Sequence, residues 1–170
     1  MKWFARILNR RSMPASPLAP GQLVVCNNSH LEELPLKIPS ERLIGFTAPA
    51  RGRFFVCDHD EVWMVDLKDK AELVEIDDAP YKFVEGRSDF VGWGLNDKEV
   101  KEVGDTGIQY EFHPSRDFVV VHYWIGAKSG EINFRISSGD WFAASLSDDG
   151  KFLVLAEPYA LAIFAMGRSA

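Results

Sequence analysis

Short apolar runs separated by polar turns dominate the chain. Within several runs apolar and polar residues alternate, which is the pattern of a β-strand whose two faces meet different surroundings. The residues between the runs are rich in Asp, Asn, Gly, Pro and Ser, which favour tight turns. No helical period persists for ten residues after position 20. We therefore expect strands at residues 22–27, 53–57, 61–67, 72–76, 89–93, 99–103, 108–112, 117–125, 131–136, 141–146, 151–156 and 160–166.

The spacing of these runs defines the expected fold class. Strands that recur about every 8–12 residues and are joined by polar turns are typical of sandwiches, barrels and propellers. We expect an all-β domain, an antiparallel meander of repeated hairpins folded into a sandwich, a partial barrel or a small propeller-like assembly of sheets. The run FVVVHYWI at Phe118–Ile125 is the most apolar, so it is expected to be a central strand. Its His122 is then expected to be a core histidine with a satisfied side chain.

The first 20 residues differ in composition from the rest. Three prolines among small residues in Ser12–Pro20 (SMPASPLAP) disfavour both helix and sheet. We expect residues 1–20 to form a basic tail and a linker, and residues 21–170 to form a single β domain. In residues 1–11 (MKWFARILNRR), apolar residues recur at helical spacing between basic ones, which favours weak contact with a membrane surface, a helix packed on the domain, or a frayed tail. One helical turn is expected at His30–Leu34.

A turn motif recurs along the chain. Phe112–Phe118 (FHPSRDF) aligns without gaps with Leu146–Phe152 (LSDDGKF), and Phe46–Phe54 (FTAPARGRF) fits with two extra turn residues. In each copy the motif joins the end of one strand to a more apolar one, and a closing strand follows (EVWMVDL, EINFRI and ALAIFAM). A degenerate fourth copy is expected to begin near Phe83, with Asp89–Trp93 as its apolar strand. Such internal repetition indicates one supersecondary unit used several times.

These units resemble blades of WD40-like β-propellers, in which a phe-ser-pro-asp-gly turn precedes an apolar strand. Leu146–Phe152 is the best match, whereas Phe112–Phe118 keeps the proline and lacks the glycine. The resemblance covers residues 43–166, although the chain has no Trp-Asp dipeptide of the kind that closes such blades. It implies a propeller-like surface that is used for binding rather than for catalysis.

The charge of the chain restricts its partners. The formal net charge is −6, and residues 12–170 carry −10 because 15 basic residues face 25 acidic ones there. An acidic body repels phosphate backbones, so nucleic-acid binding is not expected and a basic protein partner is favoured. No apolar run reaches the roughly 18–20 residues of a membrane helix, so no transmembrane segment is expected. Cys26 and Cys57 lie in apolar runs and are read as buried thiols of a cytoplasmic protein, with one disulfide between them left open.

No motif for catalysis, metal binding or cofactor binding stands out. Cys57–Asp60 (CDHD) gathers potential ligands, but it lacks partners at a matched spacing, and such residues are ordinary in a hairpin turn. Gly126–Gly130 (GAKSG) lacks the further glycine and the helix of a phosphate loop, and Ser137–Trp141 (SSGDW) does not form a nucleophile elbow. We therefore expect no catalytic residue, no metal and no cofactor.

Tryptophans and turn acids are the candidate partner-binding side chains. The tryptophans are either core anchors or the aromatic centre of an interface, and nearby acids suit a basic partner. The candidate residues are Asp58, Asp60, Trp63, Asp77, Asp78, Trp93, Trp141, Asp148 and Asp149. The expected function is a non-enzymatic protein-interaction module, for example an immunity-type inhibitor that covers a basic protein. The alternative is a small-ligand or carbohydrate-active β protein with carboxylate-based chemistry.

Overall fold

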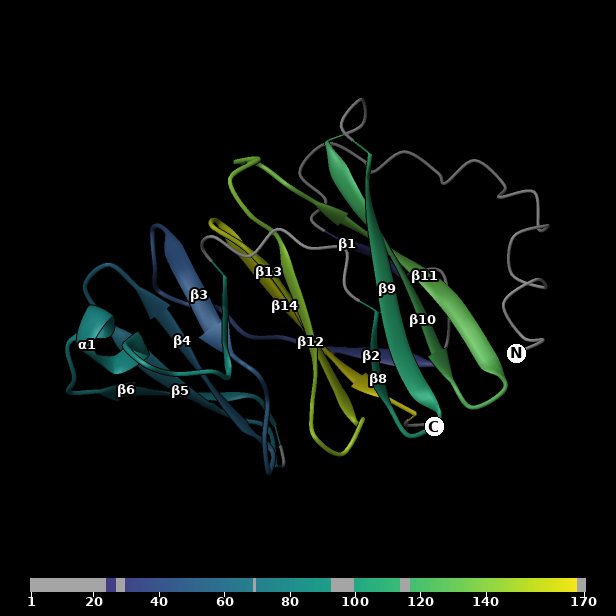
Figure 1. The fold of residues 1–170 in the computed structure, drawn as a ribbon, viewed down its shortest axis with the longest axis horizontal. Coiled ribbons are helices and arrows are strands. Elements are labelled where there is room, and N and C mark those ends of the chain that lie inside the picture. The colour runs from purple at the N-terminus through teal and green to yellow at the C-terminus, as the bar shows by residue number, and fades with distance from the viewer. Residues whose placement is uncertain (1–23, 27–29, 69, 93–99, 114–116, 168–170) are drawn as a thin grey trace.

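Three antiparallel sheets stand side by side in the computed structural model (Figure 1). The structure describes residues 24–26, 30–68, 70–92, 100–113 and 117–167. The all-β fold class and the hairpin meander expected from the sequence are confirmed. Each sheet has two open edges among the described strands, so these strands form no closed barrel. The expected tail and linker at residues 1–20 lie outside the described part of the chain.

The first sheet is here called the helix-side sheet and has the strand order β6-β5-β4-β3-β7. Its strands are β3 (Leu43–Thr47), β4 (Arg53–Asp58), β5 (Val62–Asp66), β6 (Glu72–Ile76) and β7 (Phe90–Gly92). The short helix α1 (Pro80–Val84) begins with a proline, which is favourable there because the first helical N–H has no intrahelical partner. The helix packs on one face of the sheet, and the ring centroid of Phe83 lies 5.0 Å from that of Phe55.

The other two sheets each contain one strand from the beginning of the chain. The middle sheet, in the order β12-β13-β14-β2, contains β2 (Leu31–Leu34), β12 (Ala143–Leu146), β13 (Phe152–Glu157) and β14 (Ala160–Met166). The long-strand sheet, in the order β1-β11-β10-β9-β8, contains β1 (Val24–Cys26), β8 (Lys101–Val103), β9 (Thr106–His113), β10 (Phe118–Ile125) and β11 (Lys128–Arg135). Strand β10 is central in its sheet, as expected. Early strands thus complete sheets that are otherwise built from the second half of the chain.

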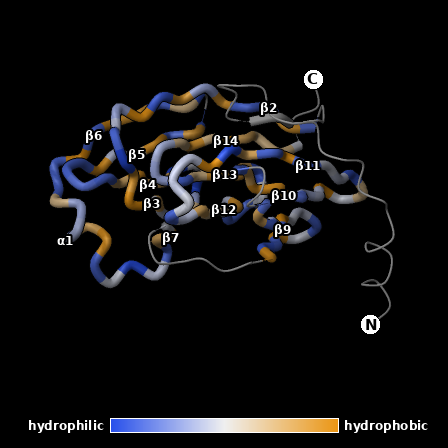
Figure 2. Tube along the Cα trace, turned by 90° about the horizontal axis from the view of Figure 1, so that it is seen from above, coloured by the Kyte–Doolittle hydropathy of each residue, from blue (hydrophilic) through white to orange (hydrophobic). Residues whose placement is uncertain are grey.

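The middle sheet is apolar on both faces. On one side Leu153 and Leu155 pack against the long-strand sheet. On the other side Val154, Ala156 and Ile163 pack against the helix-side sheet. Because successive residues of a strand point to opposite faces, a sheet covered on both sides needs an almost continuous apolar sequence. Figure 2 shows the middle strands between the two other sheets from above.

The three aligned turn motifs occupy equivalent hairpins, one in each sheet. These hairpins join β3 to β4, β9 to β10 and β12 to β13, and the closing strands β5, β11 and β14 follow as expected. A side-chain hydroxyl supports two of the turns, since Phe55 N donates to Thr47 Oγ1 and Phe152 N donates to Ser147 Oγ, both at 2.9 Å. The fourth copy near Phe83 is different, because α1 and the edge strand β7 occupy that stretch and β7 pairs with β3.

Two local expectations need correction. The helical turn expected at His30–Leu34 is wrong, because Leu31–Leu34 form strand β2 and Leu34 pairs with Ile163 of β14. A distant partner strand decides the conformation of this short segment, which has little preference of its own. Strand β3 (LIGFT) was not predicted as a separate strand, because it is buried at every position and shows no alternation.

The two cysteines lie in different sheets. Cys57 is a free, buried thiol on β4 of the helix-side sheet, whereas Cys26 ends β1 in the long-strand sheet. Burial is the main cause that raises the pKa of the Cys57 thiol to about 12, so the thiol stays protonated and unreactive at neutral pH. The disulfide that the sequence left open is therefore not formed.

Candidate functional site

Three strand ends meet at one end of the helix-side sheet. The register pairs Cys57 with Val62 and Val62 with Ile76. The loop Asp58–Glu61, which joins β4 to β5, therefore lies beside Asp77 and Asp78, which follow β6. Four of the acidic residues singled out in the sequence, at positions 58, 60, 77 and 78, are thus brought together by strand pairing.

Asp58 organises this loop from within. Its Oδ1 accepts hydrogen bonds from the backbone N–H groups of Asp60 and Glu61, both at 2.7 Å, and its Oδ2 accepts one from Ser40 Oγ at 2.8 Å. The residue is only 8% exposed. Asp58 therefore holds the turn in place, as Asp residues commonly do, and its carboxylate is already engaged.

The remaining acids of this region are exposed. We call Asp60, Glu61, Glu75, Asp77 and Asp78 the acidic end of the sheet; all five have exposed side chains. The acidic end borders helix α1, where Tyr81 is 54% exposed. The Tyr81 hydroxyl lies 2.5 Å from His59 Nδ1, so the loop and the helix are joined across the site. An exposed aromatic ring is thereby fixed beside a group of carboxylates.

The carboxylates of the acidic end repel one another. The pKa of Glu61 is raised above its ordinary value, first by partial desolvation and then by the negative charges of Glu75, Asp58 and Asp60. A raised pKa means that the ionised form is disfavoured in the folded state. A cation placed here would relieve that repulsion.

This repulsion leads to a prediction for Glu61→Gln. Because the folded-state pKa is raised, ionisation of Glu61 destabilises the fold relative to the protonated form. This cost is absent below the unfolded-state pKa and is complete once the pH has risen through the folded-state pKa. We expect the variant to melt at a higher temperature than the wild type at pH 7, and at the same temperature at low pH where Glu61 is protonated. Thermal unfolding at both pH values measures this. The gain should shrink in high salt, which screens exposed charges, and an equal gain from the exposed Glu102→Gln on β8 would contradict the explanation.

The other predicted side chains lie elsewhere. Trp63 and Trp141 are 2% and 4% exposed and belong to the core between the middle and helix-side sheets. This placement agrees with the alternative that they are core anchors. Asp148 and Asp149 lie in the turn between β12 and β13 of the middle sheet, far from the acidic end, where Asp148 accepts a hydrogen bond at 3.3 Å from Arg51 N in the turn between β3 and β4. Trp93 lies outside the described residues.

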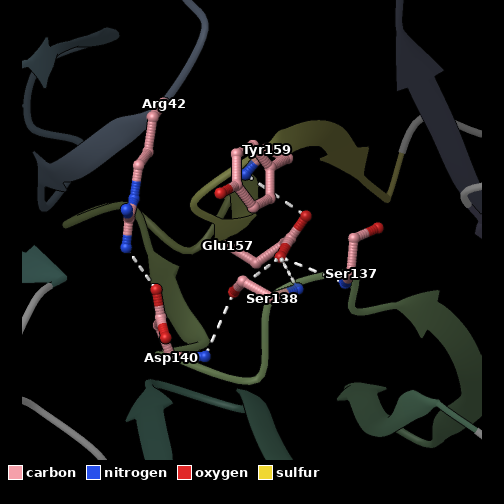
Figure 3. A network of polar contacts seen from close by, with 6 residues as sticks. All are labelled: Arg42, Ser137, Ser138, Asp140, Glu157 and Tyr159. Atoms are coloured by element: carbon pink, nitrogen blue, oxygen red, sulfur yellow. Dashed lines mark hydrogen bonds and ion pairs between the residues drawn. The ribbon is translucent and has the colours of Figure 1, made fainter.

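A buried carboxylate missed by the sequence analysis holds a loop between the sheets (Figure 3). Glu157 is fully buried at the end of β13. Its Oε2 accepts hydrogen bonds from Ser137 N, Ser138 N and Ser138 Oγ, and its Oε1 accepts one from Tyr159 N, all at 3.2 Å. The same loop contains Asp140, which forms an ion pair with Arg42. Glu157 was missed because the pair Glu157–Pro158 was interpreted only as a turn.

The loop held by Glu157 forms one wall of a cavity of about 690 Å³. Aromatic side chains of Phe112 and Trp141 line the cavity together with Asp117 and Arg135. An apolar wall with a few charged groups is the usual composition of a small-ligand site.

His122 is half-exposed rather than a core residue. Its side chain is 40% exposed on the outer face of the long-strand sheet, where Nδ1 lies 3.4 Å from Glu131 Oε1 and Nε2 lies 3.9 Å from Glu111 Oε1. Val120, its neighbour on that face, is buried, so only this part of the face is solvated. In the described part of the chain, no three His, Cys, Asp or Glu side chains are arranged to hold a metal ion.

Comparisons with known proteins found no matching family model, no similar curated protein and no similar solved structure. Among the described residues, no helix has the length and apolar character needed to cross a bilayer. The functional argument therefore depends on the geometry of the surfaces described above.

Proposed function

We propose that the protein is a non-enzymatic interaction module that binds a basic protein partner through the acidic end of the helix-side sheet. The observation that carries this proposal is the grouping of five exposed carboxylates at the end of the sheet that borders helix α1, where the ring of Tyr81 is exposed. Tyrosine is enriched among the residues that dominate binding energy, and complementary charge accelerates association and selects the partner. In this proposal the module acts in the cytoplasm.

The raised pKa of Glu61 supports the choice of a cationic partner. Partial desolvation, and after it the negative charges of neighbouring acids, disfavours ionised Glu61 in the free protein. A lysine or arginine from a partner offsets the second of these causes on binding. The partner then contributes a basic surface, as the target of an immunity-type inhibitor would.

The test compares two variants with the same change in charge. The first is Asp60→Asn/Glu61→Gln/Asp77→Asn/Asp78→Asn, which neutralises four of the five carboxylates of the acidic end and is called the acidic-end variant. The matched control is Glu32→Gln/Glu33→Gln/Glu102→Gln/Asp105→Asn, which neutralises four exposed acids on the other two sheets. Each chain is immobilised and incubated with lysate of the native host at physiological salt, and the bound proteins are identified and quantified.

We expect the wild type and the control to retain one basic partner in stoichiometric amount, and the acidic-end variant to lose it. Tyr81→Ala should weaken the same complex without altering the net charge. Equal retention by the acidic-end variant and the control would overturn the proposed surface. For an immunity-type role, the captured partner should also lose its own activity when the wild-type protein is added.

The cavity beside Trp141 supports a second candidate, a small-ligand or carbohydrate-binding function. Its aromatic walls and the charges of Asp117 and Arg135 favour a polar ligand with an apolar face. This candidate predicts that Phe112→Ala abolishes ligand binding, whereas the acidic-end variant leaves it unchanged.

A further inference from the structure

A second cavity, of about 520 Å³, lies at the end of the helix-side sheet opposite the acidic end. Four basic residues from three parts of the chain line it, together with Phe55 and Asp89. These basic residues are Arg51, Arg53, Lys68 and Arg87. In a chain with a net charge of −6, such a local concentration of positive charge is not accounted for by composition.

Two of the four cations are already paired. Arg53 Nε lies 2.9 Å from Asp66 Oδ2. The guanidinium of Arg87 binds Asp89 in bidentate fashion, at 3.1 and 3.0 Å. Hydrogen bonds lower the pKa of both carboxyls, mainly from the Lys68 backbone for Asp66 and from the Arg87 side chain for Asp89. Both aspartates are therefore ionised at neutral pH and offset one basic side chain each.

The side chains of Arg51 and Lys68 form no ion pair among the described residues, although Asp148 accepts a hydrogen bond from the backbone N–H of Arg51 and the charge of Lys68 helps to lower the pKa of Asp66. Within the described part of the chain, the basic side chains of the cavity outnumber the carboxylates beside them. Arg51 and Gly52 form a two-residue turn in which both have positive φ, 53° and 73°. Ala50 and Arg53 close this turn with two backbone hydrogen bonds of 2.8 and 3.0 Å. The stem of Lys68 passes over the turn, because its Cγ lies 3.7 Å from the position of a Cβ on Gly52.

The wall of the cavity is partly aromatic. Arg87 lies over two rings, with its Cζ 4.6 Å from the centroid of Phe83 and 5.6 Å from that of Phe55. The cation–π contacts and the bidentate pair with Asp89 together fix the orientation of this guanidinium. Because its donors are already placed, little conformational entropy is lost when an anion binds.

We propose that this cavity binds the phosphate monoester group of a small molecule. A phosphate monoester carries close to two negative charges at neutral pH and presents three acceptor oxygens, which suits a cavity whose lining has more basic side chains than carboxylates. The exposed part of Phe55 offers an apolar surface to the organic portion of the ligand. The acidic body, including Asp148 beside Arg51, disfavours long polyanions, so a small phosphorylated molecule fits this site better than a nucleic acid.

The experiment uses inorganic phosphate, phenyl phosphate and the monoanion benzenesulfonate as probes, with binding measured by calorimetry at pH 7.5. The test variant is Arg51→Asn/Lys68→Gln, in which asparagine suits the positive φ of the turn. The matched control is Lys37→Gln/Lys128→Gln, which removes two exposed cations elsewhere. Circular dichroism and thermal unfolding show whether each variant remains folded.

We expect phenyl phosphate to bind the wild type more tightly than inorganic phosphate, and benzenesulfonate to bind weakest. Affinity should fall by at least about tenfold in the test variant, since a charge-assisted hydrogen bond is worth roughly one decade, and should be unchanged in the control. Equal affinity of the folded test variant and the wild type would overturn the proposal, and so would the absence of saturable binding up to about 10 mM. The acidic-end variant should bind phenyl phosphate normally, so this result and the partner test can fail separately.

Discussion

Replacing Phe142 by alanine is expected to lower the free energy of unfolding by about 3–5 kcal/mol. The ring is fully buried immediately before β12, in the core between the middle and long-strand sheets. Its centroid lies 5.0 Å from Tyr110, 6.2 Å from Phe112 and 5.4 Å from Phe134. Removal of the ring forfeits its burial, leaves a cavity and breaks these aromatic contacts. Because a domain is stable by only about 5–15 kcal/mol, much of the total is lost.

Urea unfolding followed by tryptophan fluorescence measures this change. Val74→Ala is the control, because Val74 is 46% exposed on an edge strand and its truncation should change stability by less than about 0.5 kcal/mol. A loss of less than about 1 kcal/mol for Phe142→Ala would show that this cluster is not the core that joins the two sheets.

Replacing Glu157 by alanine is expected to cost about 3 kcal/mol. The substitution leaves the N–H groups of Ser137, Ser138 and Tyr159 without their acceptor. A buried donor that has lost its partner costs about 1–3 kcal/mol, less where water can enter. Glu157→Gln keeps one acceptor oxygen and should cost about 1–2 kcal/mol. Denaturant unfolding gives both values.

Amide hydrogen exchange separates this local role from a general loss of stability. In both Glu157 variants the amides of Ser137, Ser138 and Tyr159 should exchange faster than in the wild type, relative to core amides such as that of Val154. Asp140→Asn, on the same loop and exposed, should leave these rates nearly unchanged. Unaltered exchange at all three amides in Glu157→Ala would contradict the anchoring role.

The hairpins could be predicted from the sequence because their determinants are local. Alternation and turn residues identify β4, β5, β9, β10, β13 and β14 without knowledge of the partner strands. Strand β2 (LEEL) could not be predicted, because only its pairing with β14 makes it a strand. The helix α1 was missed because five residues are too few for a helical period to be recognised.

The residues of the candidate sites also differ in whether a local sequence pattern marks them. Asp58, Asp60, Asp77 and Asp78 were singled out because turn acids are conspicuous in a sequence, and strand register brings them to one end of the sheet. Tyr81 was missed because a single aromatic residue after a proline gives no periodic signal. The basic cavity was missed because its four cations are scattered between positions 51 and 87 in a chain whose overall charge is negative.

The placement of β1 and β2 has a consequence for assembly during synthesis. Among the described strands, the helix-side sheet is drawn from one continuous stretch, Leu43–Gly92, so it can form as soon as that stretch leaves the ribosome. Strand β1 has to wait for β11, and strand β2 has to wait for β14, the last of the described strands to emerge. The strands near the two ends of the described chain therefore pair late. A nascent polypeptide that stops short of β14 exposes apolar surface to chaperones.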